Sequence, residues 1–112
     1  MAKDDYFVIV YHICKYLYEQ LKQGKTIDVE AIQPINKHFA INQKYWEYII
    51  SNLYSENYIT GITVYRADDE IHITDLENIS ITPKGIEYLQ ENRMLKKVAN
   101  TLRTIKEITP MI

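Results

Sequence analysis

The sequence has few of the residues on which several common kinds of site depend. It contains one cysteine, Cys14, so a disulfide framework within a single chain is excluded. Its three glycines, Gly24, Gly61 and Gly85, lie far apart, so no glycine-rich loop can cradle a phosphate. No apolar stretch reaches the length of a membrane span. Acidic residues stand where a cleavable signal would have its apolar region, and we therefore expect a cytoplasmic protein that does not contact a membrane.

Clusters of metal ligands or catalytic side chains are also lacking. His12, His38 and His72 are scattered along the chain, and His12 and Cys14 would point about 160° apart on a helix. Cys14 has no histidine three or four residues away, and its apolar surroundings are of the kind that raises a thiol pKa. The acidic residues at 68–70 are adjacent in a polar turn, where carboxylates are usually solvated. The sequence therefore predicts no catalytic residue, no metal site and no cofactor, and we expect no enzymatic activity.

The overall composition is that of one ordinary folded domain. The chain has 112 residues, of which 46% are hydrophobic and 25% are charged, and we expect a single domain over residues 1–112. A net charge of −2 excludes a generally basic surface for nucleic acid, although a local basic patch remains compatible with it. Ten tyrosines suit half-buried surfaces, because each ring packs while its hydroxyl reaches water.

The first predicted helix begins after Asp4 or Asp5, which can cap it, and ends at Gly24. Two adjacent apolar stripes run along it, so we expect other elements to cover it on two sides. The first stripe consists of Val10, Ile13, Leu17 and Leu21, and the second of Phe7, Tyr11, Cys14 and Tyr18. Residues 25–32 leave two possibilities open: Thr26 and Ile27 form a short strand, or Asp28 caps a single helical turn.

Residues 33–66 have the order of a winged helix-turn-helix, namely a short helix, a turn, a longer helix and a strand. Pro34 suits the first position of a two-turn helix. Asn42 is a good N-cap for the second helix. That helix carries an apolar stripe at helical spacing, formed by Trp46, Ile49, Ile50 and Leu53. We predict a helix-turn-helix over about residues 33–57, with Trp46 as the anchor of the core.

The rest of the chain predicts a wing and a long helix. Residues 58–82 alternate apolar and polar side chains around polar turns, which predicts a hairpin with an irregular return strand. Thr82 and Pro83 form a strong helix start, and the helix is expected to run to about residue 107. Its apolar spacing breaks near Asn92, where we expect a kink or a change of packing partner. The predicted fold class is therefore α/β (α+β), a winged helix-turn-helix with a long C-terminal amphipathic helix.

The runs NQKYWEYIISNLYSENYITGI, ISITPKGIEYLQEN and RMLKKVANTLRTIKEI resemble the YjcQ family of small bacterial and phage proteins. The resemblance covers nearly the whole chain, from the first helix to the terminal amphipathic helix. It implies a winged-helix-like fold and a phage or prophage association. It brings no established functional residues to this sequence.

Two partners are compatible with these features. The leading hypothesis is a regulator-type module that binds double-stranded DNA, and the alternative is a protein-interaction module in a phage structural or host-takeover complex. In the DNA hypothesis Gln43, Lys44, Tyr48 and Ser51 face the bases, and Lys37, Arg66 and Lys84 lie near phosphates. The acidic residues at 68–70 weaken this hypothesis, because a wing tip of that charge repels phosphate.

The end of the chain predicts self-association. Leu95, Val98, Leu102 and Ile105 follow one another at spacings of three, four and three residues, which forms a heptad-like seam. This seam either packs onto the first helix of its own chain or crosses a two-fold axis to a second copy. We favour a homodimer through the C-terminal helix, because the helix is long for the single face that one domain offers.

Overall fold

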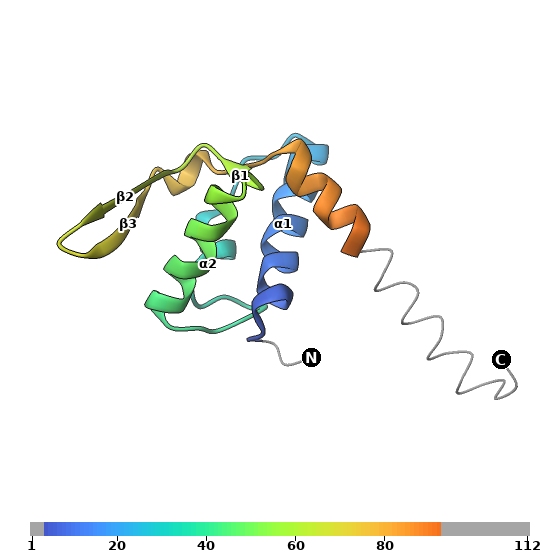
Figure 1. Ribbon diagram of the computed structural model, residues 1–112. Helices are drawn as coiled ribbons and strands as arrows, with labels where there is room; N and C mark the ends of the chain where they lie inside the picture. Colours follow the sequence, from blue (N-terminus) through green and yellow to red (C-terminus); the bar gives the residue numbers. More distant parts are fainter. Residues whose placement is uncertain (1–3, 93–112) are drawn as a thin grey trace, which may run out of the picture.

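Two helices, α1 (Tyr6–Gln23) and α2 (Gln43–Ser55), lie side by side at the centre of the fold, which is shown in Figure 1. The structure is a computed structural model that describes residues 4–92. The short 3-10 helix η1 (Val29–Ile32) lies between the two helices in sequence. Four strands and a second 3-10 helix follow α2, and a C-terminal helix begins at residue 83 and is described to residue 92. The predicted α+β class is confirmed.

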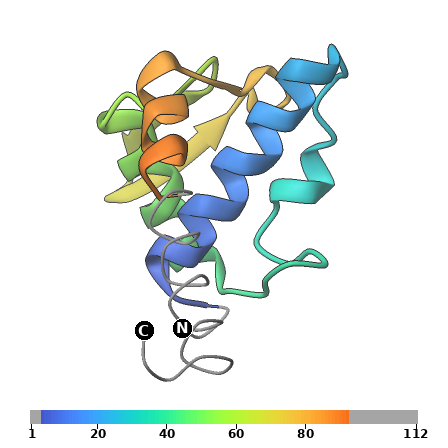
Figure 2. The ribbon, with the colours of Figure 1, turned by 90° about the vertical axis from the view of Figure 1, so that its right-hand side faces the viewer.

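Other elements flank α1 on two sides, as its two apolar stripes predict. Figure 2 shows the C-terminal helix along one side of α1 and the segment around η1 along the other. Gly24 ends α1 in the left-handed conformation with φ 66°, as predicted. Asp5 occupies the N-cap position without a side-chain hydrogen bond to the helix. Leu21 differs from the prediction, because it is 54% exposed and lies outside the core.

The short helix predicted from Pro34 is absent, and this part of the helix-turn-helix prediction is wrong. The single helical turn lies earlier, at η1, where the Asp28 carboxylate accepts the Glu30 N–H at 3.1 Å. Residues 33–42 form a loop centred on Asn36. The Asn36 side-chain oxygen accepts the backbone N–H groups of residues 38 and 39 at 2.8 and 3.2 Å. Asparagine competes in this way with a helical backbone, which explains why proline did not start a helix here.

Trp46 joins α2 to the segment before it. Its indole Nε1 donates to the Ile32 carbonyl at 2.8 Å in a buried hydrogen bond. The side chain is buried and belongs to the core, as predicted. At the start of α2, the Asn42 side chain accepts the Tyr45 N–H at 2.9 Å, which confirms the predicted cap.

Within residues 4–92, the core is a cluster of buried side chains from the two central helices, η1, the C-terminal helix and the segments between them. It consists of Ile9, Val10, Ile13, Cys14, Leu17, Ile32, Phe39, Trp46, Ile49, Ile50, Leu53, Ile59, Ile62, Ile79, Ile81 and Leu89.

The strands form a hairpin in two parts. The inner part pairs β1 (Ile59–Thr60) with β4 (Ser80–Ile81), and the outer part pairs β2 (Thr63–Ala67) with β3 (Glu70–Thr74), both antiparallel. The 3-10 helix η2 (Leu76–Asn78) lies on the return side between the two parts and gives the predicted irregular strand. Asp68 and Asp69 connect β2 to β3 with φ of 54° and 62°, the conformation of a type I′ turn.

The C-terminal helix starts at the predicted junction. The Thr82 hydroxyl accepts the Gly85 N–H at 3.0 Å and donates to the Asn57 carbonyl. The Thr82 N–H donates to the Tyr58 carbonyl at 3.0 Å. These bonds fix the start of the helix against the end of α2. The kink expected near Asn92, the seam of Leu95, Val98, Leu102 and Ile105, and the predicted extension to residue 107 concern residues at or beyond the end of the described part.

We expect the substitution Gly61→Ala to destabilise the protein by more than about 2 kcal/mol, because Gly61 combines positive φ with a close approach. Its φ is 91°, and a Cβ added there would lie 1.9 Å from the Asn78 carbonyl oxygen. The matched control is Gly24→Ala, where φ is also positive but no atom lies within 4 Å of the added Cβ. This control should cost only about 1 kcal/mol. Urea unfolding of both variants checks the difference, and equal losses would contradict the role of the Gly61–Asn78 contact.

Candidate binding surfaces

The four residues predicted to face DNA bases lie together on the outer face of α2. Tyr48 is 56% exposed, and Gln43 and Lys44 are also exposed, whereas Ser51 is half-buried. Gln43 Nε2 donates to the Glu47 carboxylate at 3.0 Å, and the Ser51 hydroxyl donates to the Tyr48 carbonyl at 3.0 Å. As far as residues 4–92 show, the face therefore offers the cationic side chain of Lys44 and the large ring of Tyr48, while Gln43 and Ser51 already make hydrogen bonds within the helix.

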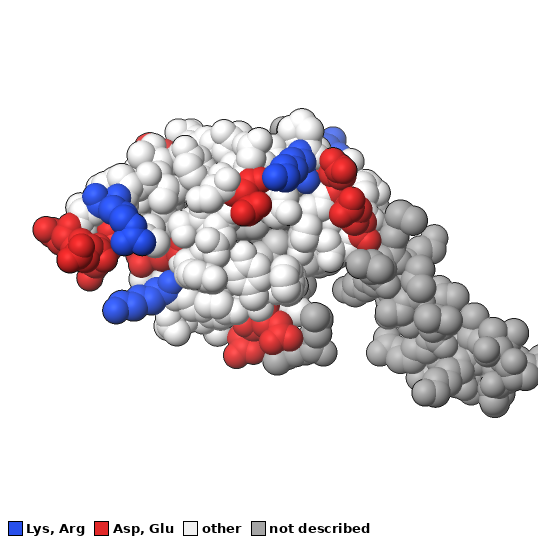
Figure 3. Space-filling model, in the orientation of Figure 1, with Lys and Arg blue, Asp and Glu red and all other residues white. Residues whose placement is uncertain are grey.

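The three residues predicted to contact phosphates lie on three different elements. Lys37 is exposed in the loop of residues 33–42. Arg66 is exposed on β2, two residues after Val64, which packs on the core, so both lie on the side of the hairpin that faces α2. Lys84 Nζ lies 5.4 Å from the centre of the Tyr58 ring. Figure 3 shows Lys and Arg side chains as separate spots on this side of the molecule, without a continuous basic patch.

The described part of the chain is strongly acidic. Residues 4–92 contain seven Lys and Arg against fourteen Asp and Glu, a formal charge of −7, whereas residues 93–112 contain five Lys and Arg against one Glu. The type I′ turn at the hairpin tip holds Asp68 and Asp69 outward, with Glu70 next to them. In Figure 3 these acidic groups project at the end of the hairpin. Phosphate would meet repulsion at the position where a DNA-binding wing usually presents cations.

An aromatic pocket of about 380 Å³ lies between α1, the end of α2 and the C-terminal helix. We call it the Phe7–Tyr88 pocket. Phe7 is 60% exposed at its edge, and the Tyr58 and Tyr88 rings stack with their centres 5.2 Å apart. Its lining residues are Tyr6, Phe7, Val10, Asn52, Leu53, Glu56, Tyr58 and Tyr88. Sequence reasoning missed this pocket, because Phe7 and Tyr88 meet only through the fold of the whole chain.

Tyr88 carries a buried hydroxyl whose oxygen has no hydrogen-bond partner within residues 4–92. Burial, together with the nearby Cys14, Tyr58 and Tyr6 groups, raises the pKa of Tyr88 to about 12. The ionised phenolate is therefore strongly disfavoured in the folded protein. An unpaired hydroxyl in the interior contributes a desolvation cost without a compensating hydrogen bond.

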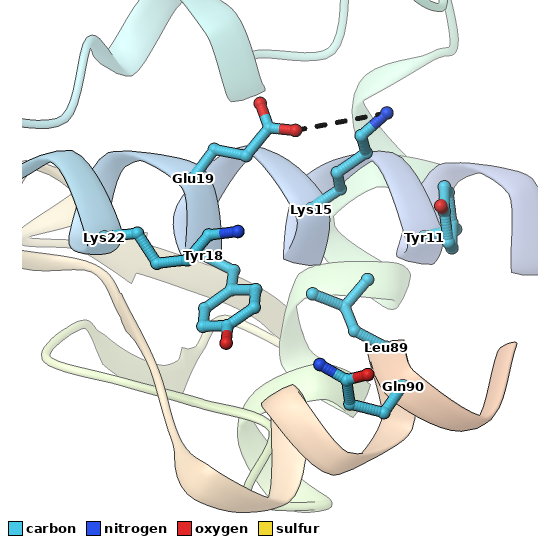
Figure 4. Close-up of a pocket in the computed structure, with 7 residues that line it drawn as sticks. All are labelled: Tyr11, Lys15, Tyr18, Glu19, Lys22, Leu89 and Gln90. Atoms are coloured by element: carbon cyan, nitrogen blue, oxygen red, sulfur yellow. Dashed lines mark ion pairs between the residues drawn. The ribbon is translucent and has the colours of Figure 1, made fainter. Parts of the chain in front are cut away.

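A second groove, of about 280 Å³, lies between α1 and the C-terminal helix and is shown in Figure 4. Tyr18 from α1 and Leu89 from the C-terminal helix point into it. Its charged side chains have partners on α1: Lys15 Nζ lies 4.0 Å from the Glu19 carboxylate, and Lys22 Nζ lies 4.6 Å from the centre of the Tyr18 ring. This groove is therefore a contact region between two packed helices with polar side chains at its edge.

The titratable side chains considered for chemistry are dispersed or buried. His12 and His38 come from separate segments but stack with ring centres 5.1 Å apart, while His72 stacks on Tyr65. Within residues 4–92, no three His, Cys, Asp or Glu side chains come together as potential metal ligands. Cys14 is buried, and burial raises the pKa of its thiol to about 12, so it lacks the thiolate character of a nucleophile.

The fold and these surfaces define a small α+β protein that presents an exposed tyrosine-bearing helix and an aromatic pocket. A sequence model of the YjcQ protein family matches residues 11–108, and the chain belongs to this family. The chain matches no curated protein and no solved structure. None of the helices in the described part has both the length and the apolar character needed to cross a membrane.

We expect the substitution Tyr88→Phe to leave the stability at pH 7 unchanged or higher, because it removes an unpaired buried hydroxyl. Tyr16→Phe is the matched control, because the Tyr16 hydroxyl accepts the Asp28 N–H at 2.8 Å and its loss should cost about 1 kcal/mol. Urea unfolding measures both differences.

The same pair of variants tests the pKa of Tyr88. A folded-state pKa above the ordinary value of 10 means that the folded state favours the protonated phenol. The stabilisation that results from this pKa difference is therefore complete below pH 10, and it is lost as the pH rises from 10 toward 12. Tyr88→Phe should remove this part of the alkaline loss of stability. An unchanged alkaline profile in Tyr88→Phe would show that other groups cause the loss.

Proposed function

We propose that this protein is a non-enzymatic binding module that contacts another protein through the outer face of α2 and the adjoining side of the hairpin. The proposal includes the phage or prophage association and the cytoplasmic location expected from the sequence. The observation that supports it best is the exposed Tyr48 on a helix with little charge.

The composition of α2 supports a protein partner. The helix QKYWEYIISNLYS contains one lysine and one glutamate, and its exposed residues include Tyr48, Tyr54 and Ser55. Tyrosine gives a large contact area at a low cost in side-chain entropy, and serine gives adaptable hydrogen bonds. Tyrosine is also enriched at protein interfaces, where charged residues are depleted from the centre.

Electrostatics point in the same direction. Residues 4–92 carry a formal charge of −7, which includes the three acidic residues at the hairpin tip. Such a surface repels nucleic acid at long range, whereas a protein partner can meet it with complementary charge.

DNA binding is a second candidate, and the shared face of α2 favours it. Gln43, Lys44, Tyr48 and Ser51 lie on one side of the helix that follows η1 and precedes the hairpin, the position of a recognition helix. Arg66 lies on the side of the hairpin toward α2. A winged helix-turn-helix would use these residues for bases and phosphates, together with Lys37 and Lys84.

Photo-crosslinking from the α2 face separates the two partners. A photoreactive phenylalanine analogue at position 48 should form an adduct in cells of the native host. Nuclease should leave the size of this adduct unchanged, and protease should degrade it. The control carries the same analogue at Gln23, which is exposed at the end of α1. An adduct that nuclease removes would support DNA, and equal adducts from both positions would contradict a binding role for the α2 face.

A gel shift with mixed genomic DNA tests the second candidate directly. If α2 binds DNA, the shift should weaken steeply as salt rises, because phosphate contacts release counterions. Lys44→Glu should abolish the shift, whereas Lys25→Glu, at an exposed site after α1, should change it much less. The absence of a shift at low salt would remove the DNA candidate and leave the protein proposal in place.

A further inference from the structure

The Phe7–Tyr88 pocket combines an aromatic floor with an acidic margin. Phe7 is 60% exposed, and the Tyr88 ring lies against Tyr58 inside the pocket. Glu56 is among the lining residues, and residues 4 and 5, both exposed aspartates, directly precede the lining residue Tyr6. Figure 3 shows a broad uncharged area over α1 and α2, with acidic side chains and a few Lys and Arg side chains at its edges. A partner that fits this pocket presents large aliphatic side chains flanked by cations.

Residues 93–108 of this chain have that chemistry. Four large aliphatic side chains recur at spacings of three, four and three, which places them on one side of a helical repeat: Leu95, Val98, Leu102 and Ile105. Five cations lie beside or opposite this stripe, namely Arg93, Lys96, Lys97, Arg103 and Lys106, against the single acid Glu107. The acidic part of the molecule and its basic segment are therefore complementary in charge.

On the helical repeat, the stripe lies closer to the pocket-lining residue Tyr88 than to Leu89, which packs against α1. On a helical repeat, Leu95 falls within about 20° of Tyr88, which is seven residues earlier. It falls about 120° away from Leu89, the buried residue that packs against α1. On a continued helical repeat, the stripe would therefore fall on the side of the C-terminal helix that carries Tyr88, a lining residue of the pocket.

Apart from the kink expected near Asn92, the sequence shows no signal for this segment to turn back onto its own pocket. Only six residues separate Tyr88 from Leu95 in the sequence. Residues 86–109 contain neither glycine nor proline, the residues that most often end a helix and reverse the chain. A second copy related by a two-fold axis needs no such reversal.

We propose that residues 93–108 of a second copy of this chain fill the Phe7–Tyr88 pocket, and that two copies exchange these segments reciprocally. The contact adjoins the outer face of α2, because the centre of the Tyr48 ring lies 6.1 Å from that of the ring of Tyr6, a lining residue of the pocket.

Sedimentation of the full chain at micromolar concentration tests the proposal. The wild type should have twice the 13.3 kDa mass of one chain. Phe7→Asp, which places a charge in the pocket, and Leu102→Asp, which places one in the segment, should each weaken dimerisation by roughly 100-fold. Ile35→Asp is the control, because Ile35 is an exposed apolar residue that does not line the pocket, and this variant should remain dimeric. Phe7→Asp should still unfold in one cooperative transition, since an exposed side chain contributes little to the fold, and its Tm should match that of Leu102→Asp, which lacks the same dimer contact.

Mixing the two monomeric variants tests whether the segment of one copy binds the pocket of the other. The Leu102→Asp protein keeps an intact pocket, and the Phe7→Asp protein keeps an intact segment, so an equimolar mixture should recover heterodimers through one restored contact. A monomeric wild type would overturn the proposal. A dimer that survives both substitutions, or a mixture that shows no recovery, would also overturn it.

Discussion

The junction between Thr82–Gly85 and the end of α2 determines where the C-terminal helix lies, and the surfaces of the molecule depend on it. The Thr82 hydroxyl and N–H bind two successive carbonyls, those of Asn57 and Tyr58. Gly85 then passes so close that a Cβ would lie 2.4 Å from the Tyr58 carbonyl oxygen. Since the helix starts at this point, Tyr88 stacks on Tyr58, and Leu89 reaches α1. The pocket and the groove of Figure 4 are both consequences of this junction.

The parts of the fold that the sequence predicts are those controlled by neighbouring residues. Asn42 and Thr82 cap their helices, and Gly24 ends α1, because each cap bonds groups within a few residues. The error at residues 33–42 has the same origin, since the Asn36 side chain outcompeted the helix that Pro34 favoured. The exposure of Leu21 depends on where the C-terminal helix lies and could not be derived from a stripe alone.

The candidate surfaces were predictable in part. The four residues of the α2 face share one side because helical spacing places them there, and this was evident from the sequence. The lysines and the arginine expected near phosphates were assigned by residue type, and the fold distributes them over separate elements. The aromatic pocket unites residues about eighty positions apart, so no local pattern predicts it. The unpaired Tyr88 hydroxyl is equally a product of tertiary packing.

The interruption of the hairpin divides it mechanically into a fixed base and an outer arm. Ile59 pairs with Ile81 in the base, whereas Thr63 pairs with Thr74 in the arm, so three additional residues on the return side separate the two ladders. The joint is anchored by Ile62 and Ile79, both buried in the core. No continuous ladder of hydrogen bonds therefore connects the tip of the hairpin to its base. Residues 68 and 69 at the tip are exposed, so the arm can be lengthened there with little effect on the core.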